Sequence, residues 1–160
     1  MRVAITGATG FLGRALVSHL AKKVGCEVTT ITRGAWQHPS SRVRSVSVGD
    51  LSAAWPAGVF AEADAVVHTA AITRWDPSSS HKRLFAVNSA AAADVARQAI
   101  GAGVNRFVFL RSIKVNGEAT APGQPLTAHD RPPPKTATAA RSCRPSWHCG
   151  RWPTRRGWTS

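Results

Sequence analysis

Short apolar runs recur along the first two-thirds of the chain, and each has the length of one β-strand. The runs beginning at Arg2 and Ala65 are almost unbroken, which is typical of parallel strands buried on both faces. The run beginning at Val43 alternates apolar and polar residues, as a half-buried strand does. We therefore predict five strands, at Arg2–Thr6, Val28–Thr32, Val43–Val48, Ala65–His68 and Arg106–Leu110.

Amphipathic segments lie between several of these runs. Phe11–Lys23 has apolar residues at helical spacing, and an Ala-rich segment, Arg83–Ile100, ends at glycines that suit a helix stop. Strands alternating with helices predict an α/β fold with a doubly wound parallel sheet, whose ligand crevice lies beyond the carboxyl ends of the strands. The apolar face expected for the first helix consists of Leu12, Ala15, Leu16 and Leu20, and the expected stop of the second is at Gly101 and Gly103.

A glycine repeat, Thr6-Gly-Ala-Thr-Gly-Phe-Leu-Gly13, joins the first strand to the first helix. Gly7 would permit a tight turn, Gly10 would let the backbone approach a pyrophosphate, and Gly13 would let the helix pack closely on the strand. The helix N-terminus would add free N–H groups and a partial positive charge. The alternative is a tight strand-to-helix turn that binds nothing, but the flanking elements favour a dinucleotide site.

Composition narrows the class of protein without changing this picture. The chain has 160 residues, 43% of them hydrophobic, which suits one ordinary domain. It has no apolar stretch of membrane-spanning length and no signal-like N-terminus, so we expect a cytoplasmic location and no membrane partner. Its three cysteines are too few to predict a disulfide framework.

The formal net charge of +13 is unevenly distributed. The segment 135–160 holds six Lys or Arg and no acid, and it has neither helical nor strand periodicity. We therefore divide the chain into a domain at 1–134 and a basic, disordered or non-native tail at 135–160. The tail could bind nucleic acid weakly through its Arg and Trp residues, or a metal through Cys143, His148 and Cys149, but neither reading is favoured, and we predict no metal site.

The glycine repeat resembles the cofactor loop of extended short-chain dehydrogenases/reductases, the NAD-dependent epimerase/dehydratase family, and further landmarks follow in order from Met1 to about Pro134. Gly49-Asp-Leu51 resembles the family's adenine contact, His68-Thr-Ala-Ala71 the segment under the nicotinamide ribose, and Arg106–Glu118 the strand and loop carrying the catalytic Ser of nucleotide-sugar epimerase-like members. The resemblance implies a Rossmann domain with cofactor contacts at Gly7, Thr9, Gly10, Phe11, Leu12, Gly13, Arg33, Asp50, Leu51, Ala70, Ala71 and Asn88.

Each landmark also has an ordinary structural explanation when taken alone. Asp50 could cap a helix, His68 could be a core histidine with satisfied hydrogen bonds, and Asn88 could face solvent. Their order behind the glycine loop makes the set more specific than its members.

The end of the second predicted strand bears on the choice of cofactor. An Asp or Glu there would bind the ribose hydroxyls of NAD, but the residues are Thr32 and Arg33. A guanidinium suits a phosphate, so the sequence leans towards NADP over NAD. The alternative is a solvated Arg at a strand end.

The resemblance implies catalysis by a Tyr phenolate, a Lys four residues later and a Ser, with hydride passing to the nicotinamide. Ser112 matches the Ser, and its ordinary role would be to satisfy backbone at a strand end. Lys114 lies too close to Ser112 to be the family Lys, and the chain contains no Tyr. We therefore expect the chain to be inactive as written.

A reading-frame shift near Lys135 would explain both the foreign tail and the missing Tyr. Back-translating Lys135–Thr159 with GC-rich codons and shifting the frame yields DGYGRSKLQAELALRAVADETGMD, which holds a YxxxK motif followed by an amphipathic helix. Such a shift would also remove the remaining strands and the substrate domain, exposing a sheet edge and apolar surface.

Three functions stay open at this point. The first is an NAD(P)-binding fragment of an oxidoreductase that acts by descent on a nucleotide sugar or similar hydroxylated substrate. The second is a non-catalytic NAD(P)-binding module or sensor, and the third is a basic protein that binds nucleic acid through its tail. The small-molecule substrate would be bound only by an intact relative, and the oligomeric state is not indicated.

Overall fold

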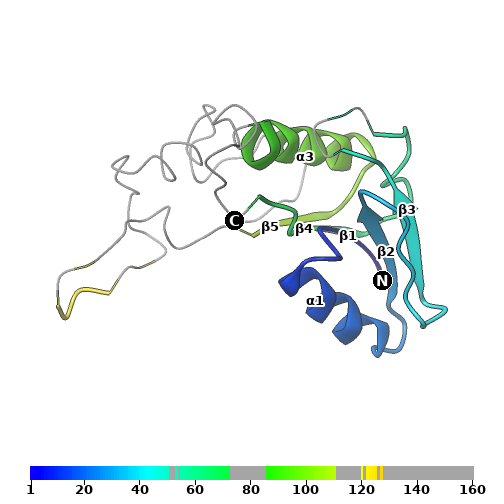
Figure 1. The fold of residues 1–160 in the computed structure, drawn as a ribbon, viewed down its shortest axis with the longest axis horizontal. Helices are drawn as coiled ribbons and strands as arrows, with labels where there is room; N and C mark the ends of the chain where they lie inside the picture. Colours follow the sequence, from blue (N-terminus) through cyan, green and yellow to red (C-terminus); the bar gives the residue numbers. More distant parts are fainter. Residues whose placement is uncertain are drawn as a thin grey trace.

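The fold is known from a computed structural model, which describes residues 1–50, 53, 55–72, 86–110, 120, 122–125 and 127. Its core is a five-stranded sheet with a helix on each face (Figure 1). The strands are β1 (Arg2–Thr6), β2 (Glu27–Thr32), β3 (Val43–Ser47), β4 (Ala65–His68) and β5 (Arg106–Phe109). All five predicted strands are present, and each bound lies within one residue of the prediction.

The strands are all parallel, in the order β3-β2-β1-β4-β5. The chain therefore adds β2 and β3 on one side of β1, and then adds β4 and β5 on the other side. This confirms the predicted doubly wound sheet, and it places the topological switch point between β1 and β4. At that point Thr6 of β1 lies opposite His68 of β4, so the loops that follow these two strands diverge from one place.

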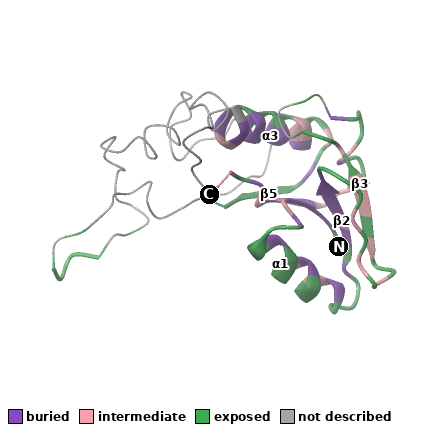
Figure 2. Ribbon diagram, viewed as in Figure 1, coloured by how far each residue is buried: buried purple, intermediate pink, exposed green. Residues whose placement is uncertain are grey.

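Helix α1 (Phe11–Ala21) packs on one face of the sheet. Its buried residues are Gly13, Val17 and Ala21, with two flanking leucines partly buried (Figure 2). The apolar face predicted from leucine spacing is therefore partly wrong, because Leu12 is 55% exposed and Ala15 is also exposed. A Cβ on Gly13 would overlap the backbone of the glycine loop, so the start of the helix carries a buried glycine where the prediction placed a leucine.

The opposite face carries the helical segment that follows residue 85. It opens as a π-helical turn, η1 (Ala86–Ala91), and continues as α3 (Ala92–Gly101). The helix predicted at Arg83–Ile100 is thus present over its described part, although its widened first turn was not foreseen. Gly103, at φ +76°, follows the helix end, as the predicted stop required.

Two hydrophobic clusters hold these layers together. One lies between the sheet and α1 and includes Ile5, Val17 and Val28, and the other lies between the sheet and α3 and includes Ile31 and Val95. The sheet ends in β3 on one side and β5 on the other, and both are more exposed than the three central strands (Figure 2). None of the described helices is long and apolar enough to cross a membrane.

Candidate functional site

The glycine loop turns sharply between β1 and α1. Gly7 has φ +71°, and its carbonyl accepts a hydrogen bond from the N–H of Gly10 at 2.9 Å. Gly10 is the N-cap of α1 in an extended conformation, and its carbonyl accepts from the N–H of Arg14 at 2.9 Å. Since the first turn of a helix has N–H groups without intrahelical partners, α1 presents donors and a partial positive charge to the crevice at the switch point.

The backbone around Gly7 leaves no room for a side chain. A Cβ there would lie 2.6 Å from the backbone N of Ala70 and 2.8 Å from the carbonyl carbon of Thr69. The positive φ of Gly7 agrees with the predicted tight turn. The missing side chain of Gly7 also allows a close approach of another segment, which the sequence had indicated only for Gly10 and Gly13. Gly7 lets the glycine loop touch the loop that follows β4.

Gly13 and Gly10 differ in what surrounds them. A Cβ on Gly13 would lie 2.1 Å from the carbonyl oxygen of Gly7 and 2.8 Å from the Cα of Ala8. Gly13 is therefore closely packed, but its nearest neighbours belong to the glycine loop and not to the strand that the prediction named. A Cβ on Gly10 would have one neighbour within 4 Å, the carbonyl oxygen of Gly7 at 3.2 Å. Gly10 is thus less crowded than Gly7 and Gly13, although a Cβ there would press on the carbonyl of Gly7. Its bare backbone fits the approach of a phosphate group.

The loop after β4 forms the other wall of the crevice. Thr69 is tied to the end of β1, because its N–H and its hydroxyl both donate to the carbonyl of Thr6, at 3.2 and 2.7 Å. Ala70 is buried against Gly7 and Ala71 is exposed. Both predicted contact residues therefore lie on the loop that packs against the glycine turn.

Asn88 holds this loop from the opposite helix. Its Oδ1 accepts from the N–H of Ile72 at 2.8 Å, and its Nδ2 donates to the carbonyl of Ile72 at 3.0 Å. The side chain lies in the π-helical turn and is half-buried, so the solvent-facing alternative for Asn88 is wrong. Its amide is engaged by the protein backbone, and this geometry suits a residue that positions the loop.

His68 lies under the crevice. It is 1% exposed, its Nδ1 is 2.7 Å from the hydroxyl of Thr6, and its ring stacks on Phe107 with a centroid distance of 6.3 Å. Burial lowers the pKa of His68 to about 4, so the ring is neutral at physiological pH. Among the described residues, none makes a hydrogen bond to Nε2. His68 is therefore a core histidine, satisfied on one nitrogen.

The ends of β2 and β3 form the far side of the crevice. Thr32 is buried and donates to the carbonyl of Gly34 at 2.7 Å, while Arg33 is exposed and its carbonyl accepts from the hydroxyl of Ser47 at 3.2 Å. The guanidinium predicted to meet a phosphate is thus accessible to solvent. Asp50 is exposed after β3, and its carbonyl accepts from the N–H of Ala53 at 3.1 Å.

The remaining predicted contacts fall into two groups. Thr9, Phe11 and Leu12 are exposed at the start of α1, with Phe11 at 93%. Leu51 and the expected catalytic Ser112 lie outside the described residues, as does the boundary predicted between residues 134 and 135. In the described part of the chain, no group of three or more His, Cys, Asp or Glu could hold a metal ion.

Sequence reasoning missed the backbone contacts that join the two loops. The side chain of Asn88 reaches Ile72, and Gly7 touches Ala70, although both pairs are far apart along the chain. No local signal encodes such contacts. The family resemblance named Gly7, Ala70 and Asn88 as cofactor contacts, but it did not indicate that the two loops contact each other.

Comparisons with known proteins identify a family that this chain matches over most of its length. The family model described as "NAD dependent epimerase/dehydratase family" matches residues 3–142. A UDP-glucose 4-epimerase of Vibrio cholerae is 35% identical over 137 residues, covering 83% of this chain and 41% of the relative.

Two solved structures extend the likeness to three dimensions. One is a short-chain dehydrogenase/reductase superfamily protein from Agrobacterium tumefaciens with bound NAD, at a TM-score of 0.70 and 27% identity, covering 89% of this chain and 42% of that one. The other is MoeE5 in complex with UDP-glucose and NAD, at a TM-score of 0.74 and 26% identity, covering 89% and 46%. The chain thus spans less than half the length of each of these three relatives.

Proposed function

Because the chain belongs to the NAD-dependent epimerase/dehydratase family, we propose that it binds the dinucleotide NAD(P) in the crevice between the glycine loop and the loop after β4. The observation that carries the proposal is the close fit of these two loops at the switch point. Gly7 touches the backbone of Ala70, and Asn88 holds the same loop from the other side. Both loops are thus held by contacts within the chain itself, and such preorganisation reduces the entropy cost of binding.

The residues present fit a pyrophosphate. Gly10 has no Cβ to keep an anion away from the backbone, and the first turn of α1 offers N–H donors and a partial positive charge. Arg33, which follows the neighbouring strand β2, adds a positive charge at the same edge of the sheet. The bound dinucleotide would supply a hydride acceptor, and the protein's part is to hold and orient it. Two relatives with bound NAD, one of them also with UDP-glucose, support a dinucleotide ligand.

Arg33 supports NADP as the preferred form, whereas the relatives support NAD. Arg33 follows the end of β2, where a guanidinium could pair with the 2′-phosphate that distinguishes NADP. We expect the Arg33→Asp variant to shift the ratio of the two dissociation constants towards NAD by about tenfold or more, since a charged hydrogen bond becomes a like-charge repulsion. Equal dissociation constants of the wild type for NAD and for NADP would refute a preference for NADP.

By descent, the intact enzyme would act on a nucleotide sugar. The name of the Vibrio relative supports a UDP-sugar substrate, with Ser112 ordering the reacting hydroxyl. Without a Tyr, the chain lacks the phenol that would accept the substrate's proton, so it would bind cofactor without turnover. The same absence supports a second candidate, a non-catalytic NAD(P)-binding module.

Calorimetric titration of the full chain with NAD and with NADP tests the cofactor proposal. The Gly10→Ala variant places a Cβ where the pyrophosphate would approach, and Gly101→Ala, whose Cβ meets nothing within 4 Å, is the control outside the site. Because a Cβ on Gly10 would also lie 3.2 Å from the carbonyl oxygen of Gly7, a urea unfolding curve of each variant shows whether the fold is retained. We expect Gly10→Ala to weaken binding about tenfold or more and Gly101→Ala to leave it unchanged. No saturable binding by a folded wild-type chain would refute the proposal.

A second experiment separates the enzyme from the module. The frame is restored from Lys135 onward so that the YxxxK motif, the remaining strands and the substrate domain are all present, and interconversion of UDP-glucose and UDP-galactose is followed by NMR. Turnover by the restored chain, together with none by the original, is the result expected for a fragment of an epimerase. Cofactor binding without turnover in both chains would favour the module.

A further inference from the structure

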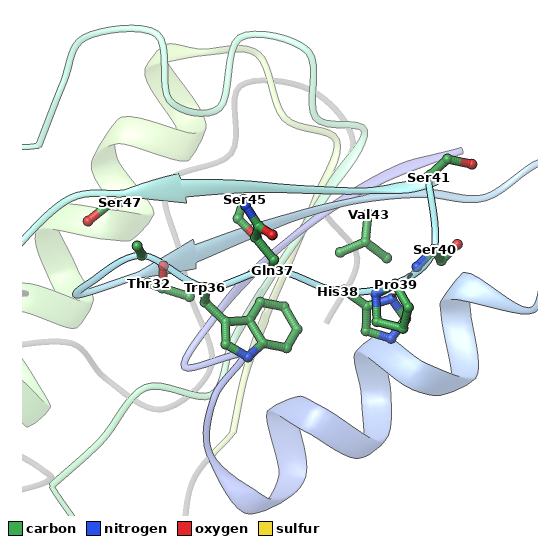
Figure 3. A pocket seen from close by; sticks show the side chains of 11 residues that line it. Thr32, Trp36, Gln37, His38, Pro39, Ser40, Ser41, Val43, Ser45 and Ser47 are labelled. Atoms are coloured by element: carbon green, nitrogen blue, oxygen red, sulfur yellow. Dashed lines mark hydrogen bonds between the residues drawn. The ribbon is translucent and has the colours of Figure 1, made fainter.

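Two pockets lie at opposite ends of the sheet. The pocket beside Trp36, between the loop 33–42 and the strands β2 and β3, reaches the carboxyl ends of these strands and so lies on the side of the dinucleotide crevice (Figure 3). The amino-end pocket, of about 510 Å³, is lined instead by the starts of β1 and β2, by residues 41–44 and by the segment 58–63 that precedes β4. Its volume is within the range of small-molecule sites. Neither the glycine loop nor residues 68–72 line it, so the amino-end pocket is distinct from the crevice.

The floor of the amino-end pocket is the side of the sheet that faces α3. Ala4 belongs to the hydrophobic cluster between the sheet and α3. In register with it, Thr29 of β2 pairs with Ala4, and Arg44 of β3 pairs with Thr29. Glu27 lies two residues before Thr29, so its side chain leaves β2 on the same side. A hydroxyl and charged groups of both signs therefore converge from two neighbouring strands.

Arg44 and Thr29 present hydrogen-bond donors to this space. Nη2 of Arg44 donates to the hydroxyl of Thr29 at 3.4 Å and lies 3.6 Å from Oε2 of Glu62. The two side chains of this ion pair are 64% and 65% exposed, so the pair contributes little to stability and leaves guanidinium donors available. Because Thr29 is the acceptor in its bond with Arg44, its hydroxyl keeps its own proton to donate. The pair of donors suits a carboxylate.

Glu27 places a negative charge beside these donors. Its carboxylate forms no ion pair within the described part of the chain. Glu27 and Thr29 project from one side of a strand at an i, i+2 spacing, which is about 7 Å. An ammonium and a carboxylate on one carbon atom, each with a hydrogen bond to the protein, span such a distance.

The remaining basic residues of the lining are engaged elsewhere. Arg2 is paired with Asp64, with Nη2 3.6 Å from Oδ1, and Arg42 donates to the carbonyl of Lys23 at 3.2 Å. Neither Asp64 nor Lys23 lines the pocket. These two guanidiniums are therefore drawn towards partners outside the pocket.

Charge and shape together narrow the class of ligand. A simple anion would be repelled by Glu27 and Glu62, and a simple cation would be repelled by Arg44, whereas a zwitterion matches both signs. Val59 and Ala63, which are partly buried against the cluster under α3, add an apolar wall. The pocket thus suits a zwitterion that carries a small apolar group.

From this combination we propose that the amino-end pocket binds a free α-amino acid with a small apolar side chain. The carboxylate of the amino acid accepts hydrogen bonds from Arg44 and Thr29, its ammonium pairs with Glu27, and its side chain packs on Val59. The proposal is independent of the dinucleotide crevice and of turnover.

Saturation-transfer NMR of the full chain with L-valine tests the site, with two analogues as chemical controls. L-Valine methyl ester keeps the ammonium without a carboxylate, and 3-methylbutanoate keeps the carboxylate without an ammonium. The matched pair Arg44→Gln and Arg106→Gln removes one guanidinium inside the pocket and one, at the start of β5, outside its lining. Glu27→Gln removes the charge that the ammonium needs. A urea unfolding curve and a dinucleotide titration of each variant show whether the fold and the crevice are intact.

We expect saturable binding of L-valine by the wild type, and binding of both analogues that is weaker by about tenfold or more, because each analogue loses a hydrogen bond between charged groups. Arg44→Gln and Glu27→Gln should each weaken the binding of L-valine about tenfold, and Arg106→Gln should leave it unchanged. If the Arg44→Gln chain does not fold, the two analogues still decide the question on the wild type.

Three results would each overturn the proposal, whether or not the dinucleotide binds. The first is the absence of saturable L-valine binding by a folded wild-type chain. The second is binding of 3-methylbutanoate as tight as that of L-valine, which would indicate a simple anion site. The third is full retention of L-valine binding by a folded Glu27→Gln variant.

Discussion

The contact between Gly7 and the loop after β4 can be measured by comparing two glycines. Gly7 and Gly25 have nearly the same backbone conformation, with φ +71° and +73°, but a Cβ on Gly25 would meet nothing within 4 Å. Replacing either with Ala imposes the same positive φ on an L-residue and the same loss of unfolded-state entropy. The two variants therefore differ by the overlap with Thr69 and Ala70 alone.

The expected magnitudes follow from these two contributions. An alanine at positive φ costs about 1–2 kcal/mol, and this cost applies to both variants. At Gly7 the added Cβ would also lie 2.6 Å from the backbone N of Ala70, and forced repacking of this kind costs about 1–3 kcal/mol more. We expect the free energy of unfolding to fall by about 2–5 kcal/mol for Gly7→Ala and by about 1–2 kcal/mol for Gly25→Ala.

Urea unfolding of both variants, followed by circular dichroism, gives this difference directly. Titration with NAD(P) adds a second readout, since Gly7→Ala should displace the loop that carries Ala70 and weaken binding, whereas Gly25→Ala should not. Losses that agree within about 0.5 kcal/mol, the ordinary scatter of such comparisons, would refute the claim that the two loops are in essential contact.

Three further predictions concern other contacts of the site. Gly13→Ala should lower the unfolding free energy by about 3 kcal/mol in urea titrations, because its Cβ would overlap the backbone of Gly7, while Gly101→Ala, with open space around it, should be neutral or slightly stabilising. Asn88→Ala should cost about 1–3 kcal/mol and raise the hydrogen-exchange rate of the Ile72 amide; unchanged exchange there would contradict the clamp. His68 should make the free energy of unfolding depend on pH. Its folded pKa of about 4 lies below the unfolded value of 6.5, so at a pH between these two values the unfolded chain binds more protons than the folded chain. The free energy of unfolding should therefore fall by up to about 3 kcal/mol as the pH drops from 6.5 towards 4. The His68→Gln variant, which can keep the bond to Thr6, should lose that dependence when unfolding is measured across this range.

The strands were predictable because each forms from a continuous run of residues. The unbroken apolar runs at Arg2–Thr6 and Ala65–His68 have the composition of strands covered on both faces, and the structure has both with these bounds. The alternating run at Val43 became an edge strand, which is half-buried as its pattern indicates. Short range and strong periodicity explain this agreement.

The first helix was predicted at the right place but with part of the wrong face. Leucines at helical spacing suggested the buried side, yet Gly13 and Ala21 are buried while Leu12 is 55% exposed. Hydrophobicity ranks leucine above glycine, so a hydrophobic pattern cannot show that the buried side of the helix start needs a residue without a side chain. That contact, between Gly13 and the carbonyl of Gly7, depends on how the loop folds back.

By itself, the sequence determined the order of strands and helices, the doubly wound sheet and the position of a glycine loop between β1 and α1, because these depend on neighbours along the chain. Only the tertiary structure decided what meets that loop. Gly7 contacts Ala70, and the Asn88 side chain forms hydrogen bonds with the backbone of Ile72, through chain separations that no local pattern encodes. The pocket beside Trp36 is likewise lined by a loop and by two strands that come together only in the folded chain. Such features arise when distant backbone segments pack, which is why they appear only in three dimensions.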